Sequence, residues 1–254
     1  MSEEQERALS FGSVAEDYEA TRPGWPREPF EEVLARFGVR DHPDIADIAA
    51  GTGKLTRTLA QLAGTLVAVE PDASLREVFQ RVLPEVAVFA GTAEELPLAS
   101  ESADVVTAGQ AFHWFDVERG LTEIARVLRP GGVVIAAWNS PPEEGTWYDA
   151  VIDFLHVANP DHLPARTRDW AVDFAHPAYG ELFETTARHE QASDHERFAR
   201  LLGTHSIINL LPPERRAALI EEAVAVAVEQ GAFAHDGTCA IPWRCELYAL
   251  RRRD

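Results

Sequence analysis

The 254-residue chain has few cysteines and few basic residues. Its two cysteines, Cys239 and Cys245, lie six positions apart in one stretch that has the pattern of a strand. At about 3.3 Å per residue they are separated by roughly 20 Å, far beyond the reach of a disulfide. We therefore expect two buried thiols in a reducing compartment.

Basic side chains are outnumbered, with 23 Lys and Arg against 42 Asp and Glu and a formal charge of −19. Such a chain offers little to a nucleic-acid backbone or an anionic lipid surface, so neither is expected as a partner. No apolar run approaches the roughly 20 residues of a membrane span. The opening stretch, MSEEQERALS, lacks the apolar core of a signal peptide. These absences predict a soluble cytoplasmic protein, and the sequence carries no indication of its oligomeric state.

What the chain does have is an alternation of short apolar stretches with helical patterns. Such alternation is typical of right-handed βαβ units around a parallel sheet. Ligands bind these sheets at the carboxyl ends of the strands, so the loops beginning near Ala50, Glu70, Ala90 and Gly109 should converge. The expected strands are 45–49, 65–69, 86–89, 104–108 and 133–138, and the expected helices are 28–37, 54–62, 74–82 and 117–128.

A turn is expected at Pro130-Gly131-Gly132, and the alternation stops after Trp138. Segments 141–180 and 199–231 are interpreted as insertions that cover the substrate. The chain is expected to form one domain over 1–254, with a cofactor-binding core (10–140), a helical cover (141–235) and a terminal strand (236–254). Further helices are expected at 147–157, 197–202 and 213–230, and further strands at 182–191 and 238–251, the last interrupted at Pro242.

The stretch DIAAGTGKLT, from Asp47 to Thr56, resembles three kinds of nucleotide-binding loop. A P-loop needs a glycine five positions before its Gly-Lys pair and a Ser or Thr after the lysine. Here those two positions hold Ile48 and Leu55, which excludes a P-loop.

The dinucleotide-binding fingerprint fits this stretch better. Gly51 and Gly53 follow a strand and begin a helix, and Glu70 ends the next strand, where an acidic residue would bind ribose hydroxyls. However, the third glycine of the fingerprint falls at Thr56. A NAD-binding oxidoreductase is therefore kept as the alternative enzyme.

The third interpretation involves no phosphate. An acidic strand residue, a small Gly-x-Gly turn and an acidic residue closing the second strand suit S-adenosylmethionine. With these motifs the chain resembles the class I S-adenosylmethionine-dependent methyltransferases. Their first motif is Asp/Glu-x-Gly-x-Gly-x-Gly, and this chain has Ala49 at the first glycine, which is tolerable where φ is negative.

Further motifs extend the resemblance over roughly residues 10 to 140, among them VAVEPD, GTAEELPLASESADVV and RVLRPGGVVIAAW. YEATRPGWP and QAFHWFD are similar to a small-molecule subgroup that includes trans-aconitate methyltransferase-like proteins. The resemblance implies a doubly wound, seven-stranded, mostly parallel Rossmann-like sheet with helical insertions covering the active site. It also implies cofactor contacts from Tyr18, Arg22, Asp47, Ala49, Gly51, Gly53, Glu70, Pro71, Thr92, Ala93, Glu94 and Gln110.

His113 lies just past the fourth strand and is the candidate general base, because an imidazole can take a hydroxyl proton near neutral pH. A purely structural packing role is the alternative. His189 and His195 match no metal-ligand spacing, so no metal is expected. The sequence thus predicts methyl transfer from S-adenosylmethionine to a small molecule, with O-methylation favoured. A non-catalytic S-adenosylmethionine-binding protein is the other alternative.

Overall fold

The computed structural model describes residues 15–142, 145–158, 174–209 and 211–254. The chain divides into two compact units, and the divisions fall partly within two long strands. The sheet unit comprises Gly24–Asn139, Arg168–Ala187 and Cys245–Asp254. The helical unit comprises Met1–Pro23, Ser140–Thr167 and Arg188–Arg244.

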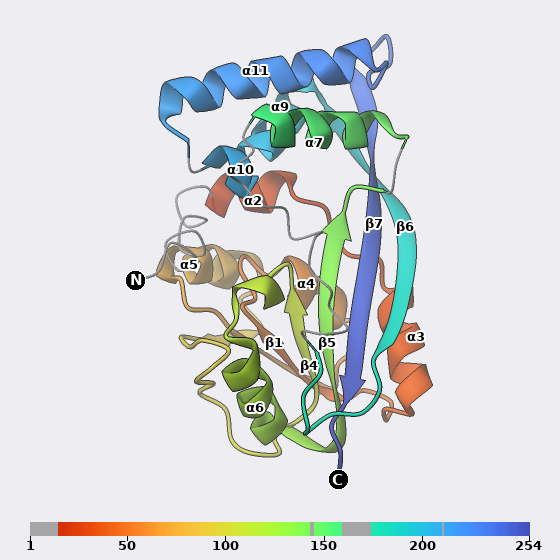
Figure 1. Ribbon diagram of the computed structural model, residues 1–254. Helices are drawn as coiled ribbons and strands as arrows, with labels where there is room; N and C mark the ends of the chain where they lie inside the picture. Colours follow the sequence, from red (N-terminus) through yellow and green to blue (C-terminus); the bar gives the residue numbers. More distant parts are fainter. Residues whose placement is uncertain (1–14, 143–144, 159–173, 210) are drawn as a thin grey trace. The chain divides into compact units, whose positions relative to one another are not determined.

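Seven strands form one sheet in the order β3-β2-β1-β4-β5-β7-β6. The pairs β1–β2, β1–β4, β2–β3 and β4–β5 are parallel. The C-terminal half of β7 belongs to the sheet unit, and its arrow points opposite to that of β5 (Figure 1). The predicted seven-stranded, mostly parallel sheet is confirmed. The strands are β1 (Asp44–Ile48), β2 (Thr65–Val69), β3 (Ala87–Phe89), β4 (Ala103–Gly109), β5 (Leu128–Ser140), β6 (Phe183–Asp194) and β7 (Thr238–Arg251).

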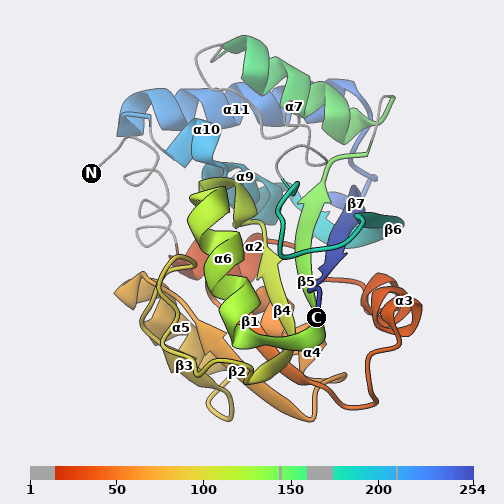
Figure 2. The same ribbon diagram turned by 60° about the horizontal axis from the view of Figure 1, so that its bottom comes forward.

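Alternate residues of the central strands face two different sets of helices. Ala46 and Val106 pack in one apolar cluster with α6, which lies in front of β4 in Figure 2. Ile45 and Val105 pack with α3 and α4 in another cluster. The sheet is therefore wound on both faces, as the alternation of strands and helices predicts. The helices of the sheet unit are α3 (Glu28–Phe37), α4 (Lys54–Leu59), α5 (Ala73–Val82), the short 3₁₀ helix η2 (Phe112–Trp114) and α6 (Val117–Val127).

Short polar or small residues set the ends of these helices. The side chain of Asp72 accepts hydrogen bonds from the N–H groups of Ser74 and Leu75 and so begins α5. Gly38 ends α3 with a left-handed φ of 63°, a conformation that costs glycine little. Such local signals explain why the sequence locates these helices within a few residues.

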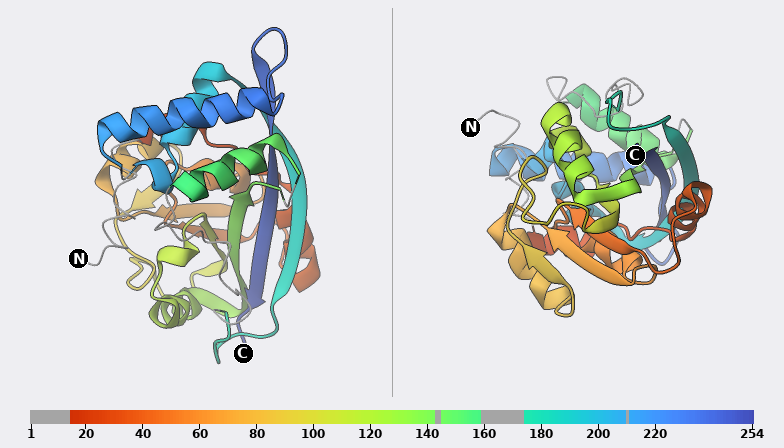
Figure 3. Two further views of the ribbon diagram at one scale, coloured as in Figure 1. Left: turned by 45° about the horizontal axis from the view of Figure 1, so that its top comes forward. Right: turned by 90° about the horizontal axis from the view of Figure 1, so that it is seen from below.

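The helical unit has an apolar core of its own. Tyr148 of α7, Phe198 of α9 and Trp243 of β7 are buried in it. Helix α7 runs alongside α11, as Figure 3 shows. The buried residues of α11 are Leu219, Ala223 and Ala227. Because they recur every fourth residue, they lie on one face of the helix. The helices of this unit are α2 (Ala15–Thr21), α7 (Trp147–Ala158), α9 (His195–Gly203), α10 (Ser206–Asn209) and α11 (Pro213–Glu229).

Two predicted interruptions were wrong. The segment Pro130-Gly131-Gly132 lies inside β5. Ala103 of β4 pairs with Leu128 of β5, and Val105 pairs with Val133, so the segment falls where the register between the two strands shifts. It is therefore part of the strand rather than a turn before the strand. Strand β7 continues through Pro242, since its alternating burial persists on both sides of the proline.

Other expectations concern thiols, membranes and insertions. Cys239 and Cys245 are free and buried, as predicted. Within the described ranges, no helix is long and apolar enough to cross a membrane. The predicted insertions 141–180 and 199–231 lie partly outside the described residues, as does the start of the predicted cofactor core at 10–14. The insertions' role as a cover stays a prediction.

Candidate functional site

The loops after β1, β2 and β4 leave the sheet at its carboxyl edge. The Ala50 N–H donates to the Val69 carbonyl over 3.1 Å, and the Glu70 N–H donates to the Phe89 carbonyl over 3.0 Å. The Gln110 N–H donates to the Ala137 carbonyl over 2.8 Å. Each of these three loops thus begins hydrogen-bonded to the neighbouring strand at the same edge of the sheet. That all four predicted loops converge on one site stays a prediction.

The turn after β1 places three of its residues in the left-handed region. Gly51 has φ 59° and Gly53 has φ 89°. A Cβ on Gly53 would lie 2.6 Å from Leu83 Cδ1, whereas a Cβ on Gly51 would meet nothing within 4 Å. Gly53 is therefore required by packing and conformation, and Gly51 by conformation alone, with open space beside it.

Ala49 departs from the first motif, and its φ is 50°. We expected alanine to be tolerated here if φ were negative. Because φ is positive, that condition is not met. A left-handed conformation costs a residue with a Cβ roughly 1–2 kcal/mol. The turn therefore carries backbone strain beside the open space at Gly51.

Glu70 follows β2 and is 4% exposed. Its Oε2 accepts from the Gly51 N–H over 2.8 Å, and its Oε1 accepts from the Asp72 N–H over 2.9 Å. Burial raises the pKa of this carboxyl to about 7, although both N–H groups act to lower it. A carboxylate oxygen accepts two hydrogen bonds, so each oxygen retains capacity for a ligand hydroxyl.

Asp47 is fully buried near the end of β1. Its Oδ2 accepts from the Thr56 hydroxyl over 2.5 Å, and its Oδ1 accepts from the Thr107 hydroxyl over 2.7 Å. Burial raises the pKa of Asp47 to about 6, against the lowering effect of the two hydroxyls and of the Thr56 backbone N–H. Asp47 therefore links β1 to α4 and β4, and a direct ligand contact from it stays a prediction.

The Thr92-Ala93-Glu94 corner follows β3. Thr92 forms an isolated bridge with Glu95, and the side chain of Ala93 is buried against the cluster that contains α6. Glu94 Oε1 accepts from the Asp116 N–H over 2.9 Å, at the residue that begins α6. The corner is thereby connected to the loop after η2.

Gln110 and His113 follow β4. Gln110 has φ 57°, and its Nε2 donates to the Asn139 carbonyl over 2.6 Å. The indole N–H of Trp138 donates to His113 Nδ1 over 3.4 Å. An indole nitrogen can only donate, so Nδ1 is the acceptor and a neutral His113 ring carries its proton on Nε2. This tautomer suits a hydrogen-bond donor at Nε2 better than a base at that atom.

The predicted site residues from Asp47 to His113 all belong to the sheet unit, and Tyr18 and Arg22 belong to the helical unit. Arg22 donates from Nε to the Thr204 hydroxyl over 2.8 Å and from Nη2 to the Thr204 carbonyl over 2.9 Å. Its guanidinium lies 5.4 Å from the centre of the Tyr18 ring. The cofactor contacts implied for Tyr18 and Arg22, and for Pro71, stay predictions.

Thr56 and Thr107 were missed by the sequence analysis. Thr56 was considered only as a missing third glycine, but its hydroxyl holds Asp47. Thr107 is the residue of β4 that pairs with Asp47 in the sheet. An early signal was available, because a buried strand aspartate needs hydrogen-bond donors. Among the described residues, no three His, Cys, Asp or Glu side chains are arranged to hold a metal ion.

The chain is similar to known methyltransferases along most of its length. Residues 46–136 match the model of a methyltransferase domain. An uncharacterized methyltransferase of Mycobacterium tuberculosis is 32% identical over 243 residues, which cover 94% of each chain. An uncharacterized methyltransferase of Schizosaccharomyces pombe is 32% identical over 216 residues, 84% of this chain and 85% of the relative.

A solved structure, that of a candidate type II methyltransferase from Anaeromyxobacter dehalogenans, is also similar. It is 27% identical with a TM-score of 0.70, and the match covers 91% of this chain and 97% of that one. The residues of the carboxyl edge fit S-adenosylmethionine, since Glu70 retains acceptor capacity for ribose hydroxyls and the turn is open at Gly51. The chain belongs to the class I S-adenosylmethionine-dependent methyltransferase family.

Proposed function

We propose that this protein methylates a small molecule and that oxygen is the favoured acceptor atom. The observation that supports methyl transfer is the arrangement at the carboxyl edge, where Glu70 accepts from the Gly51 N–H beside an open turn that could hold the methyl donor. The excess of acidic residues, 42 against 23 basic, supports a small acceptor rather than a nucleic acid. We also propose that the protein is cytoplasmic.

The proposed roles of the residues follow from what each one offers. Glu70 would accept hydrogen bonds from the ribose hydroxyls of the cofactor, and the left-handed turn at Gly51 would let backbone lie against its methionine part. The Thr92-Ala93-Glu94 corner would meet the adenine. When bound, the cofactor supplies an activated methyl group and its own leaving group, so the protein mainly has to position the acceptor and exclude water.

The tautomer of His113 bears on the acceptor. With Nδ1 accepting from Trp138, the imidazole offers N–H rather than a basic nitrogen at Nε2. An acceptor oxygen that is already ionised, as in a carboxylate, needs no base. We therefore propose that His113 positions groups at this edge and does not remove a proton.

Replacing His113 by alanine tests that role. We expect kcat to fall by less than about tenfold, because general bases contribute roughly 10²–10⁴-fold. The measurement is steady-state turnover of an identified acceptor across pH 6 to pH 9. A loss of about a hundredfold or more that depends on pH would assign the base role to His113.

The function itself is tested with S-adenosylmethionine labelled in its methyl group. The purified protein is incubated with three separate acceptor pools, namely small metabolites, RNA and protein, and Glu70→Ala serves as the control. We expect label in the small-molecule pool only, and markedly less with Glu70→Ala. Label in RNA or protein would contradict the proposed acceptor class. Cofactor binding with no transfer to any pool would instead indicate a non-catalytic binding protein.

A further inference from the structure

Asp47 is held by two hydroxyls that come from different parts of the sheet unit. Thr56 donates from α4, just after the glycine turn, and Thr107 donates from β4. Both threonines are fully buried, as is the aspartate. We call Asp47, Thr56 and Thr107 the hydroxyl clamp.

The hydroxyl clamp joins the two ends of the glycine turn. Asp47 lies two residues before Ala49, and Thr56 lies three residues after Gly53, so their hydrogen bond spans the whole left-handed segment. Thr107 is paired with Asp47 in the β1–β4 register and fixes the same carboxylate to the neighbouring strand. The middle of the turn is held separately by the bond from the Gly51 N–H to Glu70.

A buried carboxylate requires such donors. Moving an ionised group out of water is costly unless hydrogen bonds stabilise the charged form. Replacing either hydroxyl by a methyl group would leave one carboxylate oxygen buried without that donor. The carboxylate would then lose one of the two side-chain donors that fix its position, and the turn that follows β1 would be held less firmly.

We propose that Thr56 and Thr107 are positioning residues for cofactor binding, because their hydroxyls hold Asp47 and thereby keep the glycine turn in its left-handed geometry. Their action is through the turn rather than through contact with the cofactor. The inference rests on the proposed function, since it requires that the turn is where S-adenosylmethionine binds.

The test compares valine and serine variants at both positions. Thr56→Val and Thr107→Val remove the hydroxyl at nearly constant volume, whereas Thr56→Ser and Thr107→Ser retain it. Thr58→Val is a matched control, because Thr58 is a buried residue of the same helix whose hydroxyl donates to the Trp25 carbonyl over 3.1 Å. Each variant is titrated with S-adenosylhomocysteine in a calorimeter, and its thermal unfolding is recorded.

We expect each valine variant of the clamp to weaken binding by about tenfold or more, and each serine variant to bind within about threefold of the wild type. Thr58→Val should lower the melting temperature to a similar extent but change affinity by no more than about twofold. If the clamp hydroxyls had only a structural role, variants with equal loss of stability would have equal affinity for S-adenosylhomocysteine.

Three outcomes would contradict the proposal or its basis. Equal affinities for Thr56→Val, Thr107→Val and Thr58→Val would overturn the positioning role. If both clamp valine variants fail to fold while Thr58→Val folds, the hydroxyls serve folding itself and the role in binding is also overturned. If the wild type does not bind S-adenosylhomocysteine at all, the proposed function fails instead.

Discussion

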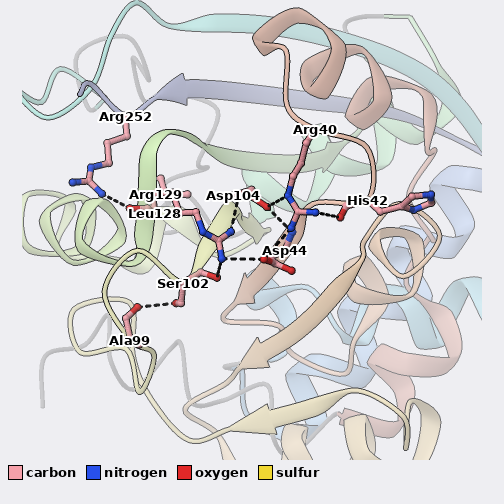
Figure 4. Close-up of polar contacts among 9 residues, drawn as sticks. All are labelled: Arg40, His42, Asp44, Ala99, Ser102, Asp104, Leu128, Arg129 and Arg252. Carbon is pink, nitrogen blue, oxygen red and sulfur yellow. Dashed lines mark hydrogen bonds and ion pairs between the residues drawn. The ribbon is translucent and has the colours of Figure 1, made fainter.

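Strand β1 carries one aspartate at each end, and the two ends of the sheet treat these charges differently. At the amino edge, Asp44 and Asp104 lie between the guanidinium groups of Arg40 and Arg129 (Figure 4). At the carboxyl edge, Asp47 is met by two threonine hydroxyls. At the amino edge the carboxylates are therefore paired with arginines. At the carboxyl edge Asp47 has no such ion pair in the described structure, and burial is the largest influence on its pKa.

The pKa values follow this division. The Thr65 hydrogen bond, together with Arg129 and Arg40, holds the pKa of Asp44 below its ordinary value. Burial raises the pKa of Asp104, but the Asp44 N–H and the two arginines outweigh it and lower the pKa overall. At the carboxyl edge burial prevails, and the pKa values of Asp47 and Glu70 rise to about 6 and about 7.

Backbone strain does not distinguish the two edges. His42 and Glu101, before β1 and β4, have φ values of 52° and 53°, close to those of Ala49 and Gln110 after the same strands. Left-handed residues therefore do not distinguish the carboxyl edge from the amino edge. Carboxyl groups whose pKa is raised by burial are described only for the carboxyl edge of these strands, and such shifts are frequent at ligand-binding sites.

The largest expected effect comes from breaking the amino edge. Asp104 accepts from the Asp44 N–H over 2.8 Å and from both arginines. Asp104→Ala should therefore lower the free energy of unfolding by about 2–4 kcal/mol, because it leaves the Asp44 N–H without this acceptor and removes one of the two carboxylates that Arg40 and Arg129 share. Urea unfolding measures this loss.

The matched readout for Asp104→Ala is affinity for S-adenosylhomocysteine. We expect affinity to stay within about twofold of the wild type, since the substitution lies at the other end of the strands. Unchanged stability, or a fall in affinity as large as the fall in stability, would show that the edges do not differ in function.

The second prediction uses the opposite pKa shifts of the two edges. Asp47 has a folded pKa of about 6 against an ordinary value of 3.8, so the folded state binds its proton more tightly than the unfolded state does. Its contribution to stability is present at low pH and is lost as pH rises from about 4 through 6, by an amount on the order of 2–3 kcal/mol. Asn at position 47 cannot titrate and would not show this loss.

Urea unfolding of Asp47→Asn and the wild type between pH 4 and pH 7 measures the difference. We expect the variant to gain relative to the wild type as pH rises. For Asp104, whose pKa is lowered, the stabilisation is present above the ordinary carboxyl pKa and is lost as pH falls. Parallel pH curves for Asp47→Asn and wild type would refute the proposed environment of Asp47.

Much of the fold could be predicted because its signals are local. Gly38 and Asp72 mark helix ends, and apolar stretches mark the strands. Gly51 and Glu70 could be linked because a fixed spacing of 19 positions joins the two motifs. These features depend on sequence order, which a single chain displays directly.

The remainder depends on contacts between segments far apart in the chain. Thr107 meets Asp47 because the β1–β4 register places them side by side, and 60 positions separate them in the sequence. The bond between Asp104 and Arg129 likewise needs two strands in register before it can form. No residue pattern predicts such a register. The hydroxyl clamp and the ion pairs of Asp44 and Asp104 with Arg40 and Arg129 are therefore found only in the structure.

The smallest expected effect concerns strain, which the two edges share. Ala49→Gly should raise the free energy of unfolding by about 0.5–1 kcal/mol, because glycine adopts a positive φ freely but loses more entropy on folding. His42→Gly is the matched change at the amino edge and should give a similar gain. Thermal unfolding compares them, and a loss of stability at either position would show that its side chain contributes more than its strain costs.

The most direct test of the carboxyl edge as the cofactor site is a calorimetric titration of S-adenosylhomocysteine into the wild type and Glu70→Ala. We expect the wild type to bind, and the variant to bind more weakly by about 1–3 kcal/mol, through loss of hydrogen bonds to the ribose. An unchanged affinity in a folded Glu70→Ala variant would remove Glu70 from the site and contradict the assignment of this edge.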